Sequence, residues 1–222
     1  RILNLIPKKP CSLEEDIFPN IIKKKMLTGK IYKNFFLDIG TPKYFNISAK
    51  KLTNYFSRPA AFLDRDGVIN HDSGYVHKKE DFKFRKGVIK GLKYLIQKKY
   101  YIFIVTNQAG IAKGIYNEND FNKLHLYLKN YLSNNDIYFN DVQYCPYHPK
   151  GKIKIFRKKS FLRKPGNQMV INIFKKWIIN KRKSFMIGDK VSDKNCAKKS
   201  DLFFSFSEGD FYKQIRNILK KN

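Results

Sequence analysis

The stretch Phe62-Leu63-Asp64-Arg65-Asp66-Gly67-Val68-Ile69-Asn70 decides how this chain of 222 residues can be interpreted. A short apolar run ends in two carboxylates separated by one residue, and a glycine follows at once. Alternate residues of a strand point to opposite faces, but a turn that begins at Asp66, which Gly67 permits, can bring both carboxylates into one crevice. Two such carboxylates can hold Mg²⁺ and serve as nucleophile and as acid/base. An isolated Asp-x-Asp would favour another interpretation, a solvated turn after a strand.

Three later segments carry polar groups that suit the same site. The apolar run 101–105 ends at Thr106-Asn107-Gln108, and the apolar run 184–187 opens into Gly188-Asp189-Lys190. Arg163-Lys164-Pro165 supplies two cations before an expected helix. In an open parallel sheet, ligands bind outside the carboxyl ends of the strands. We therefore expect carboxylates, a hydroxyl and an ammonium group to meet at that edge.

Apolar spacing predicts that strands and helices alternate after Pro59. Strands are expected over 60–64, 101–105, 141–144, 184–187 and 202–206, and helices over 87–99, 118–133, 167–179 and 192–199 and at the carboxyl terminus. Residues 145–166 are expected to form a long loop. Strand–helix alternation favours a parallel sheet with helices on both faces. The predicted fold class is therefore α/β, a Rossmann-like doubly wound parallel sheet.

The order Asp-x-Asp, Thr, Lys and Gly-Asp-x-x-x-Asp resembles the haloacid dehalogenase-like phosphatase superfamily. Asp72 and six segments more specifically resemble the D-glycero-D-manno-heptose 1,7-bisphosphate 7-phosphatases: 64–70, 74–76, 106–114, 145–149, 163–165 and 188–190. The resemblance covers most of the chain, from about Ala60 to Phe206, and implies a sheet of the haloacid dehalogenase type without a large cap domain. Histidinol-phosphate phosphatases are close relatives of that family, and polynucleotide 3′-phosphatases share a Thr-Asn-Gln-x-Gly-Ile stretch.

The resemblance implies roles for the catalytic residues. Asp64 is expected to be the nucleophile that forms an aspartyl-phosphate, and Asp66 to protonate the departing sugar oxygen and then activate water. Mg²⁺ is expected on the Asp64 carboxylate, the Asp66 backbone carbonyl and Asp189, an all-oxygen set that suits this hard cation. Thr106 is expected to donate a hydrogen bond to the phosphoryl group, and Lys164 to neutralise its charge.

The resemblance also implies which residues bind the substrate. Segment 72–75 matches the sugar-reading loop of the family, although an ordinary glycine turn would look the same. Arg163, with its planar guanidinium, suits a second phosphate or sugar hydroxyls. The predicted substrate-binding residues are Asp72, Ser73, Gly74, Tyr75, Asn107, Gln108, Ala109, Arg163 and Lys190. For Asp193 three roles stay open: binding a metal-bound water, orienting Lys190, or opening a helix.

The chain departs from the family in the 145–166 loop, where relatives hold a structural zinc. Cys145 remains, but the other three ligand positions fall on Tyr147, Ser160 and Leu162. One soft ligand cannot hold a tetrahedral zinc, so zinc is predicted to be absent. The loop is then expected either to be mobile or to be ordered by the packing of Ile153, Ile155, Phe156 and Phe161.

Residues 1–57 lie outside the phosphatase pattern. Ser12-Leu13-Glu14-Glu15 predicts a capping box that starts a helix to about Lys25, and a second helix is expected from Pro42 to Tyr55. The stretch 35–42, expected after a short strand, contains Phe-x-Asp-Ile-Gly-Thr-Pro and resembles the carboxyl-terminal end of sugar-nucleotide pyrophosphorylases. We therefore expect a small α+β segment 1–57, the remnant of a nucleotidyltransferase-like domain, and a phosphatase domain 58–222. An unrelated amino-terminal addition is the alternative.

Charge and composition narrow the partners. The net charge of +28 suits a polyanion, but the basic residues are spread along the chain, and Lys, Asn, Ile, Phe and Tyr are all abundant, as an AT-rich genome would produce. Steering of a phosphorylated sugar is the second explanation of the charge, and nucleic-acid binding the third. Three scattered Cys make no disulfide framework, which points to a reducing cytoplasm. No apolar run approaches the ~20 residues of a membrane span, so no membrane partner is expected, and a monomer is predicted.

Together these features predict a Mg²⁺-dependent phosphatase that removes the 7-phosphate of D-glycero-D-manno-heptose 1,7-bisphosphate, in the synthesis of nucleotide-activated heptose for lipopolysaccharide or other surface glycans. Its expected partners are the small phosphorylated sugar and an upstream nucleotidyltransferase domain, in a bifunctional protein of which this chain is a fragment. Three alternatives stay open: a phosphatase of histidinol phosphate or another small metabolite, a polynucleotide 3′-phosphatase, and a degenerate domain that acts as a scaffold.

Overall fold

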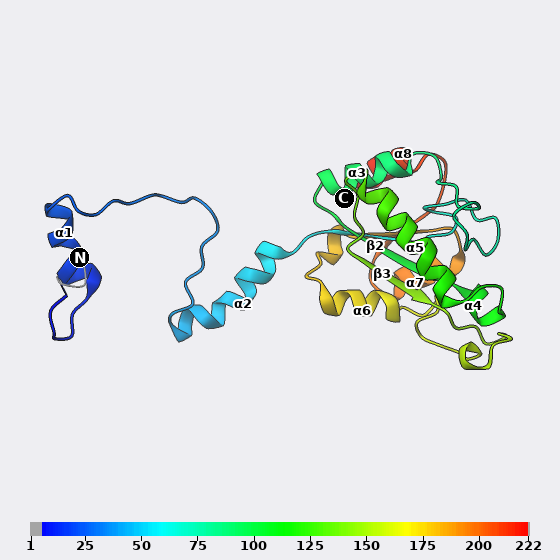
Figure 1. Ribbon diagram of the computed structural model, residues 1–222, viewed down its shortest axis with the longest axis horizontal. Helices are drawn as coiled ribbons and strands as arrows, with labels where there is room; N and C mark the ends of the chain where they lie inside the picture. The colour runs from blue at the N-terminus through cyan, green and yellow to red at the C-terminus, as the bar shows by residue number, and fades with distance from the viewer. Residues whose placement is uncertain (1–5, 222) are drawn as a thin grey trace. The chain divides into compact units, whose positions relative to one another are not determined.

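The computed structural model describes residues 6–221 and divides the chain into two compact units, Arg1–Ala49 and Lys50–Asn222 (Figure 1). The predicted boundary after residue 57 lies later in the chain, and helix α2 (Pro42–Phe56) crosses the structural boundary. Residues 1–5 of the predicted amino-terminal part lie outside the described residues. That this part is the remnant of a nucleotidyltransferase-like domain remains a prediction.

The first unit begins with a helical segment that the Ser12 side chain caps. Ser12 Oγ accepts a hydrogen bond from Glu15 N at 3.2 Å, and Ser12 N donates to Asp16 Oδ2 at 2.8 Å. A π-helical turn, η2 (Leu13–Ile17), continues into α1 (Phe18–Lys23). The first predicted helix is therefore present as two consecutive pieces.

Helix α2 starts in the Phe-x-Asp-Ile-Gly-Thr-Pro stretch, which forms a turn and a cap before it. Asp38 Oδ1 accepts a hydrogen bond from Gly40 N at 2.8 Å, and Thr41 Oγ1 accepts one from Tyr44 N at 3.3 Å. Pro42 is the first helical residue, a position where no amide donor is needed. The predicted second helix is confirmed.

The short strand predicted before Phe35, and with it the β part of the amino-terminal segment, is wrong. Residues 24–41 contain no strand, and neither does the rest of the first unit within its described residues 6–49. A strand is stabilised by hydrogen bonds to a neighbouring strand, so an extended stretch without one forms no sheet.

The second unit is built on a parallel sheet of five strands. These are β1 (Ala60–Leu63), β2 (Tyr101–Asn107), β3 (Asp141–Cys145), β4 (Phe185–Gly188) and β5 (Phe203–Phe206). Their order in the sheet is β3-β2-β1-β4-β5, and all pairings are parallel. The predicted α/β class with a parallel sheet is confirmed.

Side chains of the central strand alternate between two cores. Ala61 and Leu63 face one core, and Ala60 and Phe62 face the other. The first core is covered by α3 (Val88–Gln97), α5 (Glu118–Ser133) and α8 (Phe211–Lys221), and the second by α6 (Gln168–Lys176) and α7 (Val191–Lys199). Figure 1 shows α3, α5 and α8 on one side of the sheet and α6 on the other. Both faces of the sheet are thus buried, as apolar parallel strands require.

The strand register brings the polar strand ends together. Leu63 pairs with Ile104 of β2 and with Ile187 of β4. Asp64 follows Leu63 at the end of the central strand, and its amide donates to Ile187 O at 3.0 Å. The chain leaves β1 toward β2 and later crosses to β4 on the other side, so this edge is a topological switch point, where open α/β sheets bind ligands.

Two features of the loops differ from the sequence prediction. A short helix, α4 (Ala109–Lys113), follows β2 and was not predicted. In the 145–166 loop, Phe156 packs against an apolar cluster, as expected, but Ile155 is 72% and Phe161 85% exposed, so the packing predicted for these two is wrong. No helix in the described part of the chain is both long and apolar enough to cross a membrane.

Among the residues that the structure describes, His125 on α5 has no hydrogen-bond partner for either of its buried ring nitrogens. Its ring stacks on Phe121, with the centroids 5.1 Å apart. Burial, aided by the positive charge of Arg65, lowers the pKa of His125 to about 4. An unfolded histidine has a pKa of about 6.5, so folding is favoured above that pH and disfavoured progressively as the pH falls toward 4.

We expect His125→Phe to remove this acid sensitivity. Phe keeps the ring contact and cannot take up a proton, so the variant should avoid a loss of about 2 kcal/mol in the free energy of unfolding between pH 7 and pH 5. Urea denaturation at the two pH values measures the difference. His71→Phe, at an exposed position, is the control and should keep the wild-type pH dependence. Equal pH dependence in wild type and His125→Phe would contradict the assignment.

Candidate active site

A cavity of about 450 Å³ lies at the carboxyl ends of the central strands. Its lining residues are Asp64, Asp66, Asp72, Gly74, Tyr75, Thr106, Asn107, Gln108, Ala109, Lys113, Tyr116, His148, Arg163, Lys164, Lys190, Ser192 and Asp193. All predicted site residues are among them except Ser73 and Asp189. Ser73 is exposed on the 72–75 turn, and Asp189 lies just outside the lining, beside Lys190.

Lys164 lies between two carboxylates in the interior of this site. Its Nζ is 2.9 Å from Asp64 Oδ2 and 2.6 Å from Asp193 Oδ1, and it donates a hydrogen bond to Val105 O at 2.8 Å. The three charged side chains are almost fully buried, with exposed fractions of 1% for Lys164, 8% for Asp64 and 1% for Asp193. A buried ammonium needs such partners, because an unpaired charge in the interior is strongly unfavourable.

Asn107 fixes the backbone of Lys164. Its Nδ2 donates to Lys164 O at 3.1 Å, and its Oδ1 accepts from Lys164 N at 3.0 Å. Both ends of the amide are therefore bonded within the protein. Asn107, which the sequence places among the substrate-binding residues, acts in the structure by positioning Lys164.

Burial and the paired charges set the ionisation of this group. Burial raises the pKa of Asp64 to about 6, because desolvation outweighs the attraction of Lys164, and Asp193 adds repulsion. Burial by itself would lower the pKa of Lys164, but Asp64 and Asp193 together raise it. Lys164 therefore stays an ammonium at neutral pH, and Asp64 is mostly a carboxylate there.

Asp193 is held by the helix that it opens. Its Oδ2 accepts a hydrogen bond from Lys190 N at 2.9 Å, which caps α7, and its Oδ1 pairs with Lys164. Gly188 makes room for it, because a Cβ at that position would lie 2.2 Å from Asp193 Cβ. The helix-opening role is thus confirmed, and the pairing with Lys164 is a role that the sequence prediction missed.

The Asp66 carboxylate is held by three neighbours. Arg65 Nε and Nη2 donate to Asp66 Oδ1 at 3.1 and 2.9 Å, and Asn70 Nδ2 donates to the same oxygen at 3.0 Å. Gln108 Nε2 donates to Asp66 Oδ2 at 3.0 Å. The Arg65 side chain is only 2% exposed, so this charge-assisted pairing is a buried one.

Gln108 joins Asp66 to Thr106. Its Nε2 also donates to Thr106 Oγ1 at 2.8 Å, and its Oε1 accepts a hydrogen bond from the Tyr116 hydroxyl. Thr106 Oγ1 acts as an acceptor here, so its own proton is free to be donated into the cavity. Gln108 is buried and, like Asn107, acts by positioning its neighbours.

Three carboxylates provide a place for a divalent cation. Asp64, Asp189 and Asp193 each offer an oxygen, and these oxygens lie within 4.8 Å of one another. Asp189 Oδ1 is buried and accepts no hydrogen bond in the described part of the chain. Hard oxygen ligands and an unbonded buried carboxylate oxygen fit Mg²⁺. The Asp66 carboxylate is bonded elsewhere, so only its backbone carbonyl, as the sequence predicts, is left for the cation.

Gly67 shapes this cation site. It has a φ of +80°, and a Cβ there would lie 2.5 Å from Asp189 Oδ2. The turn after Asp66 therefore depends on glycine for its backbone conformation and for the close approach of the carboxylate.

Four contacts attach segment 72–77 to the rim of the cavity. Lys190 Nζ lies 3.0 Å from Asp72 Oδ2, and Lys113 Nζ donates a hydrogen bond to the Tyr75 hydroxyl. Arg65 Nη2 donates to Val76 O at 2.6 Å, and the ring of His77 stacks on Tyr116 with the centroids 4.9 Å apart. Lys190 and the backbone amide of Gly74 lower the pKa of Asp72, although burial opposes this. In turn, Asp72 and Asp189 raise the pKa of Lys190 against the effect of burial.

The sequence prediction missed four lining residues: Lys113, Tyr116, His148 and Ser192. Lys113 lies within the segment 106–114 that carries the resemblance, and Ser192 follows Lys190 by two residues, so the nearness of each to a motif is the sequence signal that could have found it. No sequence signal reveals Tyr116, because its place depends on α4, and a single histidine such as His148 in an expected loop has no spacing that indicates a site.

Comparisons with known proteins identify relatives of the second unit. The family model for polynucleotide kinase 3 phosphatase matches residues 60–216. A D-glycero-β-D-manno-heptose-1,7-bisphosphate 7-phosphatase of Rhodopseudomonas palustris is 38% identical over 163 residues, which are 73% of this chain and 91% of that protein. A D-glycero-α-D-manno-heptose-1,7-bisphosphate 7-phosphatase of Photorhabdus laumondii is 39% identical over 142 residues, 64% of this chain and 78% of that protein.

Solved structures show the same fold. A protein of Mesorhizobium loti described as a HAD-like phosphatase matches with a TM-score of 0.67 and 23% identity, over 74% of this chain and 85% of that one. The D,D-heptose 1,7-bisphosphate phosphatase of B. bronchiseptica, complexed with magnesium and phosphate, has a TM-score of 0.63 and 19% identity, over 74% of this chain and 99% of that one. The predicted sheet of the haloacid dehalogenase type is confirmed.

We expect Gly67→Ala to weaken Mg²⁺ binding by at least tenfold. The added Cβ would displace the Asp189 carboxylate, a proposed ligand, by steric contact. The rise in the thermal unfolding temperature across a MgCl₂ titration measures the affinity, because a ligand that binds only the folded state stabilises it. Gly209→Ala is the matched control, since it also has a positive φ (+51°) but open space around its Cβ. Equal Mg²⁺ affinity in both variants would contradict the placement of the cation.

Proposed function

This chain belongs to the D-glycero-D-manno-heptose-1,7-bisphosphate 7-phosphatases, within the haloacid dehalogenase-like phosphatases, and we propose that it hydrolyses the 7-phosphate of that sugar bisphosphate. The observation that carries the proposal is the buried Asp64–Lys164–Asp193 group beside Asp66. This group supports the proposal that Asp64 is an oriented nucleophile, with the fixed positive charge of Lys164 next to it. An inactive scaffold would have no need of three buried, paired charges.

In the first proposed step, a carboxylate oxygen of Asp64 attacks the phosphorus of the 7-phosphate. The bond between phosphorus and the sugar oxygen breaks, and Asp66 donates a proton to that oxygen. Lys164 supports the attack, because its ammonium lies 2.9 Å from Asp64 Oδ2 and can offset charge on the phosphoryl oxygens. The Thr106 hydroxyl donates a hydrogen bond to one of those oxygens.

In the second step, water releases phosphate from Asp64. Asp66, now a carboxylate, takes a proton from the attacking water, and the bond between phosphorus and the Asp64 oxygen breaks. Arg65, Asn70 and Gln108 hold Asp66 through both steps. Mg²⁺, held by Asp64, Asp189 and the Asp66 carbonyl, would offset negative charge on the phosphoryl group.

The cavity suits a small molecule with two phosphates. Its volume of about 450 Å³ is in the range of small-ligand sites. Besides Lys164, its lining includes the cationic side chains of Lys113, Arg163 and Lys190. We propose that Arg163 meets the second phosphate or the sugar hydroxyls. The relatives named for the α and the β anomer are about equally similar to this chain, so both anomers belong in the assay.

A polynucleotide 3′-phosphatase is the second candidate. The family model that matches residues 60–216 carries that description, and the net charge of +28 suits a nucleic acid. The identity to heptose bisphosphate phosphatases and the absence of a concentrated basic stripe in the sequence favour the sugar substrate.

Three further expectations complete the proposal. We propose that the protein acts in the cytoplasm, since its cysteines form no disulfide framework, and that it is a monomer. Segment 1–57 would be the end of a nucleotidyltransferase-like domain in a bifunctional protein. A full-length transcript without an upstream Gly-rich nucleotidyltransferase motif would contradict this last expectation.

We expect Asp64→Asn to lower phosphate release from the heptose bisphosphate by at least a thousandfold, because the amide cannot act as nucleophile. Release is measured with Mg²⁺ on both anomers, on histidinol phosphate and on a 3′-phosphorylated oligonucleotide. Asp136→Asn, at an exposed position after α5, is the matched control and should keep full activity. Faster release from the oligonucleotide than from either anomer would transfer the assignment to the second candidate.

We expect the purified protein to contain no stoichiometric zinc. Cys145 is buried and donates a hydrogen bond to Tyr147 O, and no second cysteine or histidine joins it in a metal-holding group among residues 6–221. Metal analysis by mass spectrometry measures the content, and a zinc chelator in the presence of excess Mg²⁺ should leave activity unchanged. One zinc per chain would overturn the prediction.

A further inference from the structure

Besides Lys164, the 145–166 loop brings His148 and Arg163 to the wall of the cavity. The loop has little regular structure, with one 3₁₀ turn, η3 (Lys154–Phe156). Its outer side chains Ile155 and Phe161 are exposed and do not hold it. Some other contact must therefore fix the loop if His148 and Arg163 are to meet a substrate in a defined position.

Phe156 is the residue of this loop that packs against the apolar cluster beside α4, whereas Tyr147 and Leu162 pack against the core on the α6 side of the sheet. The cluster contains Ile111, Tyr116 and Phe121, with Tyr144 and Phe156 packed against it. These five residues come from α4 and the turn after it, from α5, from β3 and from η3. On the loop side, the Phe156 ring also meets the ring of Tyr147, with the centroids 6.1 Å apart.

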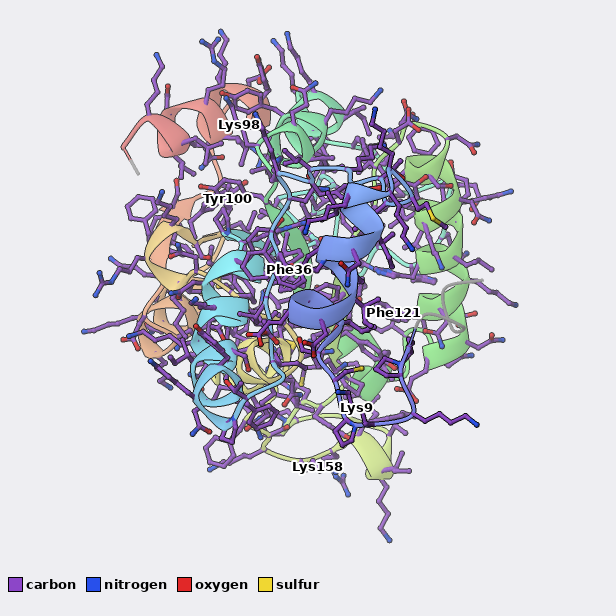
Figure 2. All side chains as sticks on the ribbon, turned by 90° about the vertical axis from the view of Figure 1, so that its left-hand side faces the viewer. Lys9, Phe36, Lys98, Tyr100, Phe121 and Lys158 are labelled. Atoms are coloured by element: carbon purple, nitrogen blue, oxygen red, sulfur yellow. The ribbon has the colours of Figure 1, made fainter. Side chains whose placement is uncertain are left out.

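Backbone contacts near Phe156 seat the loop directly on α4. Ile153 N donates to Ala112 O at 2.9 Å, and His148 N donates to Phe156 O at 3.1 Å. Gly151 is buried in the same contact. The contact leaves no room for a side chain there, because a Cβ would lie only 2.8 Å from Ala112 O. Figure 1 shows the loop after β3 running beneath α4, and Figure 2 labels Lys158 on this loop and Phe121 on α5.

The same cluster supports the acid/base residue from behind. Tyr116 donates to Gln108, which holds Asp66 and Thr106. The guanidinium of Arg65, the other holder of Asp66, lies 5.7 Å from the centroid of the Phe121 ring. The apolar cluster thus contacts the loop on one side and the network around Asp66 on the other.

We propose that Phe156 is a positioning residue, the anchor that fixes the 145–166 loop on α4 and so places His148 and Arg163 against the substrate. The inference rests on the proposed function for its kinetic part only. Lys164 has its own support, since Asn107 holds its backbone and Val105 O its ammonium. Loss of the anchor should therefore affect substrate affinity more than the chemical step.

Phe156→Ala tests the anchor, with Ile155→Ala as the matched control one residue away on the exposed side. We expect a KM for the heptose bisphosphate about tenfold higher, the factor that loss of one charge-assisted contact corresponds to, with kcat changed less than threefold. Ile155→Ala should match the wild type, and Phe156→Leu, which keeps most of the apolar volume, should recover most of the loss.

Limited trypsin digestion tests the same anchor without any substrate. The loop offers cleavage sites at Lys150, Lys152, Lys154, Arg157, Lys158, Lys159 and Arg163. Phe156→Ala should be cut in the loop at least fivefold faster than wild type, and Ile155→Ala at the wild-type rate. Gly151→Ala, which leaves the cluster intact but pushes the loop from Ala112, should also be cut faster.

The two readouts separate the inference from the proposed function. Equal loop cleavage in wild type, Phe156→Ala and Gly151→Ala would overturn the anchor, whatever the substrate proves to be. Faster cleavage would support it even if the heptose bisphosphate is not hydrolysed. Faster cleavage with a fall in kcat and an unchanged KM would contradict the assigned role of His148 and Arg163.

Discussion

The ammonium group of Lys164 is almost fully buried, 2.9 Å from Asp64 and 2.6 Å from Asp193. A charge in such a place is stable only with its partners, so the positions of all three side chains depend on one another. The surrounding structure meets this need at several points. Asn107 fixes the Lys164 backbone, Val105 O accepts from the ammonium, and Gly188 lets Asp193 approach. The fold thereby holds the proposed nucleophile in one orientation beside a fixed positive charge.

Much of this arrangement follows from the sequence. The parts that the sequence does not predict share one cause, their dependence on tertiary contacts. Apolar runs that end in Asp64, Thr106 and Asp189 predict the sheet edge, because parallel strands deliver their carboxyl ends to one side. The pairing of Asp193 with Lys164 depends on the tertiary path of the loop, and no local spacing reveals it. The same applies to the hydrogen bonds of Asn107 to the Lys164 backbone. Asn107 also lines the cavity, and its binding of substrate stays a prediction.

The errors of the sequence prediction have physical reasons as well. A strand was expected before Phe35 from local composition, but the first unit has no partner strand within residues 6–49. In the 145–166 loop, four apolar residues were expected to pack if the loop was not mobile, yet Ile155 and Phe161 face solvent. Local hydrophobicity does not say which side chains a loop can bury, since that depends on the surface it lies on. Here the surface is α4, a helix too short for its periodicity to be recognised.

The central claim is that Asp64 carries the phosphoryl group between two chemical steps while Asp66 handles the protons. Trapping the intermediate tests this most directly. Asp66→Asn enzyme, in which water activation is slowed, is mixed with the heptose bisphosphate and Mg²⁺, quenched in acid and reduced with borohydride, and the modified residue is located by mass spectrometry. The account predicts reduction of the Asp64 side chain alone, dependent on substrate. Modification at Asp189 or Asp193, or at no carboxylate while phosphate is still released, would contradict it.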